Sequence, residues 1–549
     1  MAEPRVTPFG KIFSLLLVFG LIAVGMYMVK GRSFTKSGDS SQESDGSPAE
    51  VAQLQLEVPR LAPAAAYQVK DNIVPIEISE YAGYAGLIAA NGGLEPNKES
   101  VFYKIGGFQV KLTVSEEESW SSLNSGALAG SVTTVDVLGV YGRQFQVVVP
   151  VQIGYSRGAD GLVVRREINR INSLKGKIIA AAQFTEVDFF IRYLAQEAGL
   201  AVHALSTVDA PPDADKINLV YTEDGFSAGD LFLQDVTTGR NRLAGAVTWE
   251  PKTTEVVTRS NGQAKILTTN KNLLIISDIL VLNKGFAEQH PEMVTGLVRG
   301  VLQGNRMVRD DPEAHLDVVA RAFKWTREDA RSELAKVHLS NLPENLAFFS
   351  GAIDAAGSFG GIYQSAVYAY GPELIGDPVD PDHFVDLTGL KAAQASGDFA
   401  GQQIAIAPIR SSARGSLEND PLLSKDIRFL FQPNSATLDL QNQDNLKNLD
   451  AIKQLLQVSP GSTILLRGHV DNAMIPEFRR QGGEAFVRQM ALKAVELSKN
   501  RASEIRRVLK EKLAVDSKRL DVVGRGWEEP AGSDSEQNRR VEVQWFTVE

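Results

Sequence analysis

The sequence predicts an α/β protein whose middle part holds mainly parallel sheets, with one N-terminal transmembrane helix and a smaller α+β domain at the C-terminal end. Three observations predict this. Short apolar runs alternate with amphipathic stretches from residue 71 onward, an uncharged run of eighteen residues lies near the N-terminus, and the last 125 residues place strand-like runs around two long helical stretches. A length of 549 residues also suggests two to four domains, at about 150 residues each.

Composition and charge exclude several classes of function. The net charge is −10 and no Lys/Arg-rich block is present, so we expect no nucleic-acid partner. Cysteine is absent, which excludes disulfides, cysteine-ligated metals, thiol nucleophiles and a lipoprotein anchor. The six histidines form no close pair, so we expect no metal site and no cofactor.

The apolar run at residues 12–29 predicts the transmembrane helix. Eighteen residues at 1.5 Å each span roughly 27 Å, close to the hydrocarbon thickness of a bilayer. A cleaved signal peptide is the alternative, but the run is long for one and continues past the small residues at 23–25. We therefore expect a single-pass inner-membrane protein with residues 1–11 in the cytoplasm and the bulk of the chain in the periplasm. A proton channel of the stator type needs an acidic residue in its membrane-spanning helix. Residues 12–29 contain none, so this function is disfavoured.

Residues 30–66 are predicted to be a flexible linker. Six serines fall within Ser33 to Glu50, among glycines and acidic residues, and no apolar periodicity is present. Such a linker has a root-mean-square reach of roughly 30–36 Å.

The next part of the chain alternates predicted strands and helices. The strands are expected at 73–78, 108–114, 130–138, 145–153 and 177–181, and the helices at 84–91, 116–128 and 186–198. This order is typical of α/β domains with parallel sheets, in which ligands lie at the carboxyl ends of the strands.

One motif points to catalysis but lacks its context. Gly154 to Gly158 fits the G-x-S-x-G pattern of a nucleophile elbow, which requires a helix directly after the serine. The residues that follow predict a turn and a second strand, and the first histidine after the motif is His203. We therefore expect no catalytic residue and no enzyme.

Residues from about 70 to 375 resemble periplasmic solute-binding proteins of the type II fold, in the family that binds nitrate, sulfonates, taurine or thiamine precursors. The resemblance is carried by the segments 80–84, 123–127, 133–136, 156–163, 171–178, 245–251 and 279–281. It implies a domain at 67–397 with two lobes, lobe one at about 70–152 and 272–375 and lobe two at about 153–271. The crossings between the lobes are then expected near 151–155 and 266–274.

The same resemblance implies a cleft that binds a small molecule. The candidate ligand-binding residues are Tyr81, Gly83, Tyr84, Thr133, Thr134, Asp136, Ser156, Arg157, Thr185, Trp249 and Glu250. Helix N-termini together with Arg157 suit an anionic or zwitterionic solute. Asp136 and Glu250 instead favour a cationic group, so the ligand's charge stays open.

A second linker is predicted at 398–424, and residues 425–549 resemble an OmpA-like peptidoglycan-binding domain. The matching segments are 468–472, 497–502, 524–530 and 538–542. In that family an aspartate and an arginine hold the two ends of diaminopimelate, and these roles fall on Asp471 and Arg501, with Asn472 and Arg540 completing the candidate set. Val470, Ala494 and about sixteen extra residues between Asp471 and Arg501 depart from the family pattern. A degenerate domain used for protein–protein contact is the alternative.

Together these parts predict a protein bound to both the inner membrane and peptidoglycan, with no enzymatic activity. The expected function is a scaffold or sensor of the cell envelope, with a membrane protein as its partner. The alternative is a receptor that delivers a small anionic or zwitterionic solute to an ABC-type uptake system.

Overall fold

The computed structural model describes most of the chain after the predicted linker. The described residues are 50–115, 119–271, 273–352, 357–376, 378–406, 422–431, 435–459, 462–533 and 535–546. The predicted cytoplasmic tail and transmembrane helix lie outside them, as do residues 30–49. Among the helices that are described, none is both long and apolar enough to span a bilayer.

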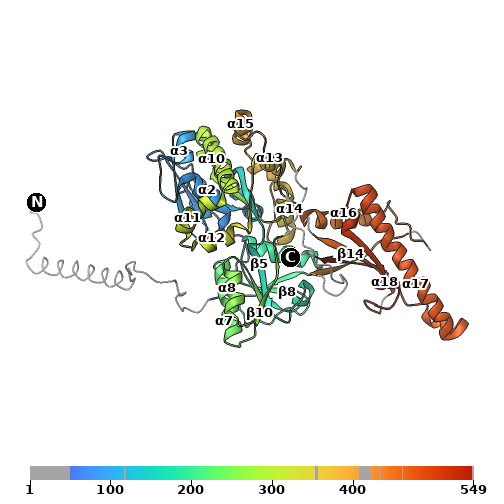
Figure 1. Cartoon of the computed structure of the whole chain (residues 1–549). Helices are drawn as coiled ribbons and strands as arrows, with labels where there is room; N and C mark the ends of the chain where they lie inside the picture. The colour runs from blue at the N-terminus through green and yellow to red at the C-terminus, as the bar shows by residue number, and fades with distance from the viewer. Residues whose placement is uncertain are drawn as a thin grey trace, which may run out of the picture. The chain divides into compact units, whose positions relative to one another are not determined.

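Lobe one is built on a six-stranded sheet with the order β12-β4-β11-β3-β1-β2. The sheet lies among the blue and yellow-green helices in Figure 1. The strands are β1 (Ile73–Ile78), β2 (Gln109–Val114), β3 (Gly130–Thr134), β4 (Val147–Ser156), β11 (Ser277–Asn283) and β12 (Val337–Leu339). Strands β1, β2 and β3 are parallel, whereas β11 runs antiparallel to both β3 and β4. All residues of β3 and β11 are buried, as expected for central strands covered on both faces.

Helices cover both faces of this sheet. They are α2 (Ala85–Asn91), α3 (Val101–Gly106), α4 (Trp120–Asn124), α5 (Val135–Tyr141), α9 (Lys284–Gln289), α10 (Pro291–Asp310), α11 (Pro312–Phe323), α12 (Arg327–Leu334), α13 (Leu342–Ser350), α14 (Phe359–Tyr370) and α15 (Thr388–Ser396). Two expectations need correction. The predicted strand 130–138 ends at Thr134, because its second half forms α5, and the described part of the predicted helix 116–128 is helical only over α4.

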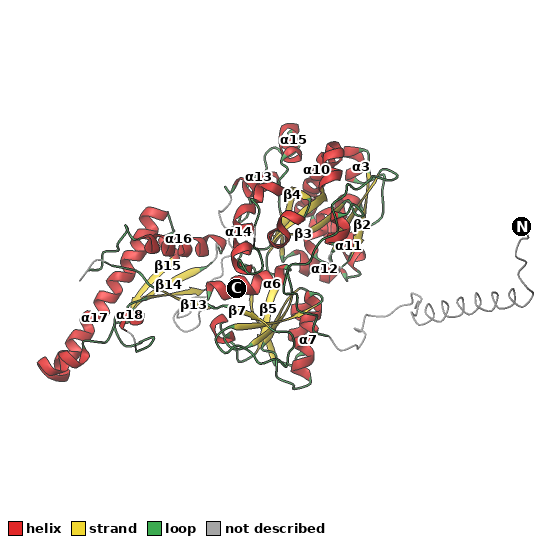
Figure 2. Ribbon diagram, turned by 180° about the vertical axis from the view of Figure 1, so that it is seen from behind, coloured by secondary structure: helices red, strands yellow, loops and turns green. Residues whose placement is uncertain are grey.

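Lobe two is a second six-stranded sheet with the order β10-β5-β9-β6-β8-β7 (Figure 2). Its strands are β5 (Asp160–Arg165), β6 (Ile178–Ala182), β7 (Val202–Ala204), β8 (Ile217–Thr222), β9 (Gly245–Trp249) and β10 (Ala264–Thr269). Its helices are α6 (Glu186–Glu197), α7 (Gly225–Thr237) and α8 (Lys252–Arg259). The strands β6, β7, β8 and β9 are parallel, and β5 and β10 close one edge in antiparallel orientation.

The chain passes between the lobes twice. β4 belongs to the sheet of lobe one and β5 to that of lobe two, and the return runs from β10 to β11. β12 then pairs with the end of β4, where His338 lies opposite Tyr155. The two-lobed α/β fold predicted from the resemblance is therefore confirmed by the order of the strands.

Residues 50–67 are held along both lobes, although their composition predicts part of a flexible linker. The N–H of Ala52 donates to the carbonyl of Tyr221 in lobe two at 2.7 Å, and Gln55 exchanges two hydrogen bonds with the Gln183 side chain. In lobe one, the side chains of Gln144, Ser121, Asn124 and Asn283 bind the backbone of residues 59–67. Side-chain amides and the Ser121 hydroxyl thus satisfy the backbone of this segment, and its Leu54, Val58 and Leu61 pack against the core.

The C-terminal domain has a four-stranded sheet with the order β13-β16-β14-β15. Its elements are β13 (Leu423–Ile427), α16 (Gln443–Val458), β14 (Thr463–Gly468), α17 (Ile475–Leu513), β15 (Leu520–Gly524), α18 (Ser535–Asn538) and β16 (Val541–Phe546). Two non-helical glycines, Gly482 and Gly483, interrupt α17. This arrangement is the predicted smaller α+β domain.

Two paired glycines let α17 lie directly on the sheet of this domain. Gly468 of β14 is the register partner of Gly524 of β15. A Cβ atom added at Gly468 would lie 2.1 Å from the carbonyl oxygen of Ser498, and one at Gly524 would lie 2.3 Å from that of Val495. Both contacts are with the backbone of α17, so only glycine allows this close approach. This close approach fixes the distance between α17 and the strands.

Candidate functional site

The two lobes enclose a cavity of about 110 Å³. A single enclosed water needs roughly 10–15 Å³ of such space, so the cavity has room for a ligand of several non-hydrogen atoms. Seven of the residues predicted from the sequence line it, namely Tyr81, Tyr84, Thr133, Thr134, Ser156, Thr185 and Trp249. The residues that were not predicted include Glu77, Ser79, Ser115, Trp120, Ser131, Asp160, Glu186, Glu223, Asp224 and Asp278.

An aromatic pair from lobe one forms one wall of the cleft. The rings of Tyr81 and Tyr84 meet edge to face with centroids 5.3 Å apart, and the Tyr84 hydroxyl donates to the Asp278 carboxylate at 3.3 Å. Gly83, predicted as a ligand contact, lies outside the lining. A Cβ atom there would come within 2.2 Å of the Tyr81 ring, so this glycine makes room for the tyrosine rather than touching the cavity.

Two buried carboxylates lie where the chain crosses between the lobes. Asp160 accepts hydrogen bonds from the Ser156 hydroxyl at 2.5 Å and from the Asn270 amide at 3.0 Å. Burial raises the pKa of Asp160 to about 6. Burial and then the negative charge of Asp160 raise the pKa of Asp278 well above its usual range. An aspartate inside the apolar run of β11 was the sequence signal for Asp278.

Asp136 was predicted in the cleft but lies behind it, in the first turn of α5. Its side chain is fully buried, and neither carboxylate oxygen has a hydrogen-bond partner among the described residues. Burial raises the pKa of this carboxyl to about 7. The group is therefore a buried acid next to the site, not a ligand contact.

Arg157 and Glu250, the two charged residues expected to set ligand charge, lie outside the cavity lining. The Arg157 side chain donates from Nε to the carbonyl of Lys271 at 3.1 Å. Glu250 accepts from the N–H and hydroxyl of Thr254 and pairs with Lys336 at 2.9 Å. Arg157 therefore binds the segment that returns from β10 to β11, and Glu250 joins lobe two to lobe one through Lys336.

The C-terminal domain brings Asp471 and Arg501 into one electrostatic group. Asp471 follows β14, and Arg501 lies on α17, which the paired glycines hold against that strand. Asp471 is ion-paired with Arg539 at 2.7 Å, while the Arg501 guanidinium stacks over Phe431, 5.0 Å from its ring centroid. Burial first, and then the charge of Arg539, lowers the pKa of Arg501, against an opposing effect of Asp471.

The two remaining predicted residues of this domain lie apart from that group. Asn472 is exposed, and Arg540 pairs with Asp426 at 3.0 Å. The residue that joins Asp471 is Arg539, which the sequence analysis did not single out. Two consecutive arginines precede β16, and the sequence alone does not show which of them faces Asp471.

Comparison with known proteins gives a family match for the C-terminal part of the chain and similar solved structures for a larger part of it. The model of the OmpA family matches residues 430–544. Curated protein sequences give no match to the chain. Among solved structures, the periplasmic aliphatic sulphonate binding protein SsuA from Escherichia coli is similar at 12% identity and a TM-score of 0.43, over 58% of this chain and 92% of that one. The periplasmic nitrate-binding protein NrtA from Synechocystis PCC 6803 is similar at 12% identity and a TM-score of 0.42, over 61% and 90%.

Proposed function

We propose that this chain is a cell-envelope protein that binds peptidoglycan through its C-terminal domain and presents a solute-binding domain in the periplasm, as a scaffold or sensor. The observation that supports the proposal is that Asp471, with its ion-pair partner Arg539, acts electrostatically on Arg501 from a different element of a domain that matches the OmpA family.

The chemistry of this group suits the end of a zwitterionic amino acid such as diaminopimelate. A carboxylate recognises an ammonium group, and a guanidinium recognises a carboxylate through paired hydrogen bonds. Asp471 supplies the first and Arg501 the second. Arg539 pairs with Asp471 and its charge also acts on Arg501, so the group contains a second guanidinium.

Binding of the full-length protein to purified sacculi tests this proposal. We expect Asp471→Ala and Arg501→Ala each to reduce co-sedimentation by at least tenfold. The matched control is Arg507→Ala, on the same helix, whose guanidinium pairs with Glu504 and Glu511 instead. Unchanged sedimentation of both site variants would leave the domain as a protein-contact module.

We also propose that residues 12–29 anchor the chain in the inner membrane. The support is their uncharged apolar sequence and the periplasmic setting of the two folded parts. A chain that starts at residue 50 should leave the membrane fraction, whereas the full-length chain should remain there after an alkaline wash.

A further inference from the structure

We propose that the cleft between the lobes binds an organic cation, an alkylammonium or similar group held by carboxylates and aromatic rings. This inference rests on the proposed solute-binding function and names the class of solute.

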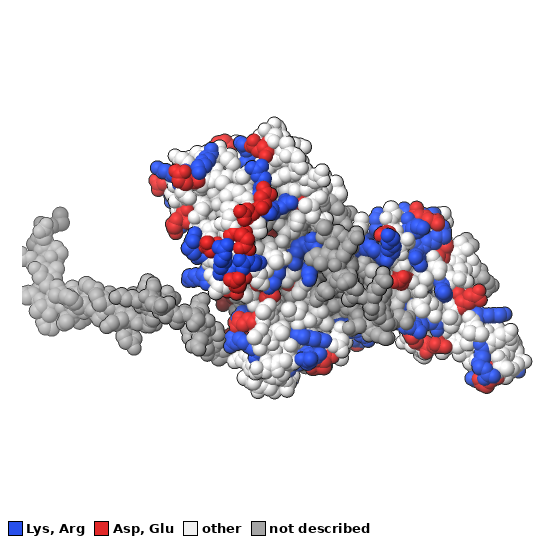
Figure 3. Space-filling view, viewed as in Figure 1, with Lys and Arg blue, Asp and Glu red and all other residues white. Residues whose placement is uncertain are grey.

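The first argument is the charge of the cleft. Six lining residues are acidic, and none of the lining residues among those described is Lys, Arg or His; the six are Glu77, Asp160, Glu186, Glu223, Asp224 and Asp278. The outer surface differs, because acidic and basic residues alternate there (Figure 3). Over α11 and α12, for example, Arg327 and Arg331 both pair with Glu313. The one-sided charge of the cleft would repel an anion.

The helix ends at the cleft already hold negative charge. Helix N-termini attract anions, which is the basis for expecting an anionic ligand. The first turn of α6 contains Glu186, and Asp224 precedes α7 as its N-cap, where its carboxylate accepts the N–H of Ser227 at 2.7 Å. The chain's own carboxylates therefore take the place that a bound anion would occupy.

Unpartnered polar atoms in the cavity wall supply the second, independent observation. One carboxylate oxygen of Asp278 and the hydroxyls of Thr134 and Tyr81 are buried, and none of them completes a hydrogen bond of normal geometry among the described residues, although the Tyr81 hydroxyl lies near the Asp278 carboxyl. All three residues line the cavity. A buried acceptor without a donor is costly, and an ammonium group offers up to three donors.

The cavity also presents aromatic surface, which favours an organic cation. Trp249 and Trp120 line it together with the two tyrosines, and Gly225 leaves room for the Trp249 ring, which a Cβ atom would approach to 2.1 Å. Aromatic faces attract ammonium groups within about 6 Å.

The carboxylates of the cleft are not clustered as the ligands of a metal ion would be. Among the described residues, the only three histidine or carboxylate side chains whose possible ligand atoms all lie within 4.8 Å of one another are those of His469, Glu529 and Glu542, in the C-terminal domain.

Binding should be coupled to proton release. Asp278 faces Tyr81 and Tyr84 from lobe one and Asp160 from lobe two, while Asp136 and Glu186 lie in the same electrostatic environment. No described cation lines the cavity to offset these charges. A bound ammonium would favour the ionised form of Asp278, so a proton leaves as the ligand enters.

The test uses the detergent-solubilised full-length protein and two pairs of probes. Choline and ethylammonium, as chlorides, are compared with ethanesulfonate and nitrate, as sodium salts, by thermal shift and calorimetry. We expect the cations alone to raise the melting temperature, with a binding enthalpy that differs between buffers of different ionisation enthalpy. Asp278→Asn should weaken cation binding at least tenfold while raising the melting temperature of the free protein, a combination that a purely structural role does not produce.

The matched control is Asp310→Asn, an exposed aspartate at the end of α10, which should bind the cations as the wild type does. Shifts with the anions alone would overturn the cation inference and leave solute binding intact. No shift with any probe would overturn both, and would leave the sacculus result as the separate measure of wall binding.

Discussion

The ammonium of Lys336 lies 2.9 Å from the carboxylate of Glu250, and this ion pair joins the two lobes beside the hinge. Lys336 precedes β12, in the sheet of lobe one, while Glu250 follows β9 of lobe two. The Glu250 side chain is only 5% exposed, so the pair is largely buried away from water. If the lobes opened at this point, either the two charged groups would separate or one side chain would have to follow the other.

Loss of this pair should destabilise the two-lobed domain. Lys336→Met leaves Glu250 with Thr254 as its remaining hydrogen-bond partner, and we expect the free energy of unfolding to fall by about 1–3 kcal/mol. Urea denaturation of this variant, of Glu250→Gln and of the double variant gives the coupling energy. Lys391→Met, at an exposed position of α15, is the control and should change stability by less than about 0.5 kcal/mol. Strict additivity of the two single variants would contradict the interpretation.

The buried Asp136 should make stability depend on pH. Because its pKa is raised to about 7 in the folded protein, the folded state binds a proton more tightly than the unfolded chain between about pH 4 and 7. Stability therefore falls as pH rises through this window, by up to about 4 kcal/mol. Asp136→Asn should raise the melting temperature at pH 8 and have little effect at pH 5. An equal shift at both values would show that Asp136 titrates normally.

The sequence predicts much of the fold but only part of the cleft. The alternation of apolar runs places β1, β2 and β6 correctly, because each is bounded by residues that end a strand. The same reasoning extends β3 too far, since the β-branched Val135 and Val137 on either side of Asp136 are compatible with a strand as well as with a helix. Tertiary packing decides between the two.

Two of the cleft residues that were missed have the same cause. Asp160 and Asp278 are more than a hundred positions apart and meet only because β4, β5 and β11 converge at the hinge. Conversely, the guanidinium of Arg157 is a group that binds anions, but in the structure it donates a hydrogen bond to the carbonyl of Lys271. Residue type gives the chemistry that is available, whereas strand order decides which groups face one cavity.

The glycine pair under α17 should prove essential to wall binding. Gly524→Ala places a methyl group against the carbonyl of Val495, so α17 must move away from the sheet at a cost of about 1–3 kcal/mol. Arg501 moves with the helix, and we expect sacculus binding to fall together with stability. Gly532→Ala, where the nearest atom is the end of the flexible Gln537 side chain, is the control. Normal sacculus binding by Gly524→Ala would contradict this account.

We expect Asn283 to contribute more than any other residue to holding residues 50–67 against the lobes. Its buried side chain accepts from the N–H groups of Tyr67 and Phe286 and donates to the carbonyls of Ala65 and Leu123. We expect Asn283→Ala to lower the free energy of unfolding by about 2–4 kcal/mol, because these groups lose their partner.

Asn169→Ala, at an exposed position, is the control for this substitution. Limited proteolysis reports the attachment of the segment directly, and cleavage within residues 59–66 should become faster in the Asn283 variant alone. Equal protection in both proteins would mean that the segment is held by its other contacts.

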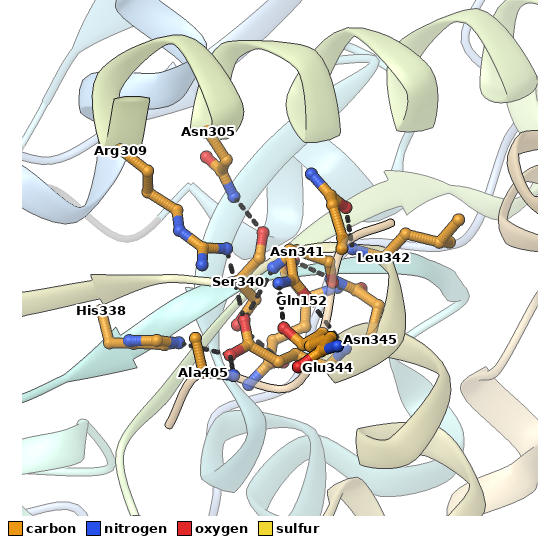
Figure 4. A network of polar contacts seen from close by, with 12 residues as sticks. Gln152, Asn305, Arg309, His338, Ser340, Asn341, Leu342, Glu344, Asn345 and Ala405 are labelled. Atoms are coloured by element: carbon orange, nitrogen blue, oxygen red, sulfur yellow. Dashed lines mark hydrogen bonds and ion pairs between the residues drawn. The ribbon is translucent and has the colours of Figure 1, made fainter. Parts of the chain in front are cut away.

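Glu344 should determine how firmly residues 402–405 are attached to the two-lobed domain. Its fully buried carboxylate accepts from His338 Nε2 and from the N–H groups of Asn341 and Ala405 (Figure 4). Burial alone would raise the pKa of Glu344, but these hydrogen bonds outweigh it and the pKa is lowered. This contribution is present above the ordinary glutamate pKa and is lost as pH falls below it. Glu344→Gln should speed hydrogen exchange at Ala405 at pH 7, and unchanged protection there would exclude this role.

The attachment of residues 50–67 sets the order in which the domain would respond to a mechanical load. From the N-terminal side, the first contacts are those of Ala52 and Gln55 with lobe two, and those of residues 59–67 with lobe one come later. At the other end, residues 402–405 are fastened to lobe one through Asn341 and Glu344. A pull applied between residues 50 and 406 would therefore peel the segment from lobe two before it strained lobe one. Tension between these two points would therefore release lobe two from the segment while lobe one stayed attached at both ends.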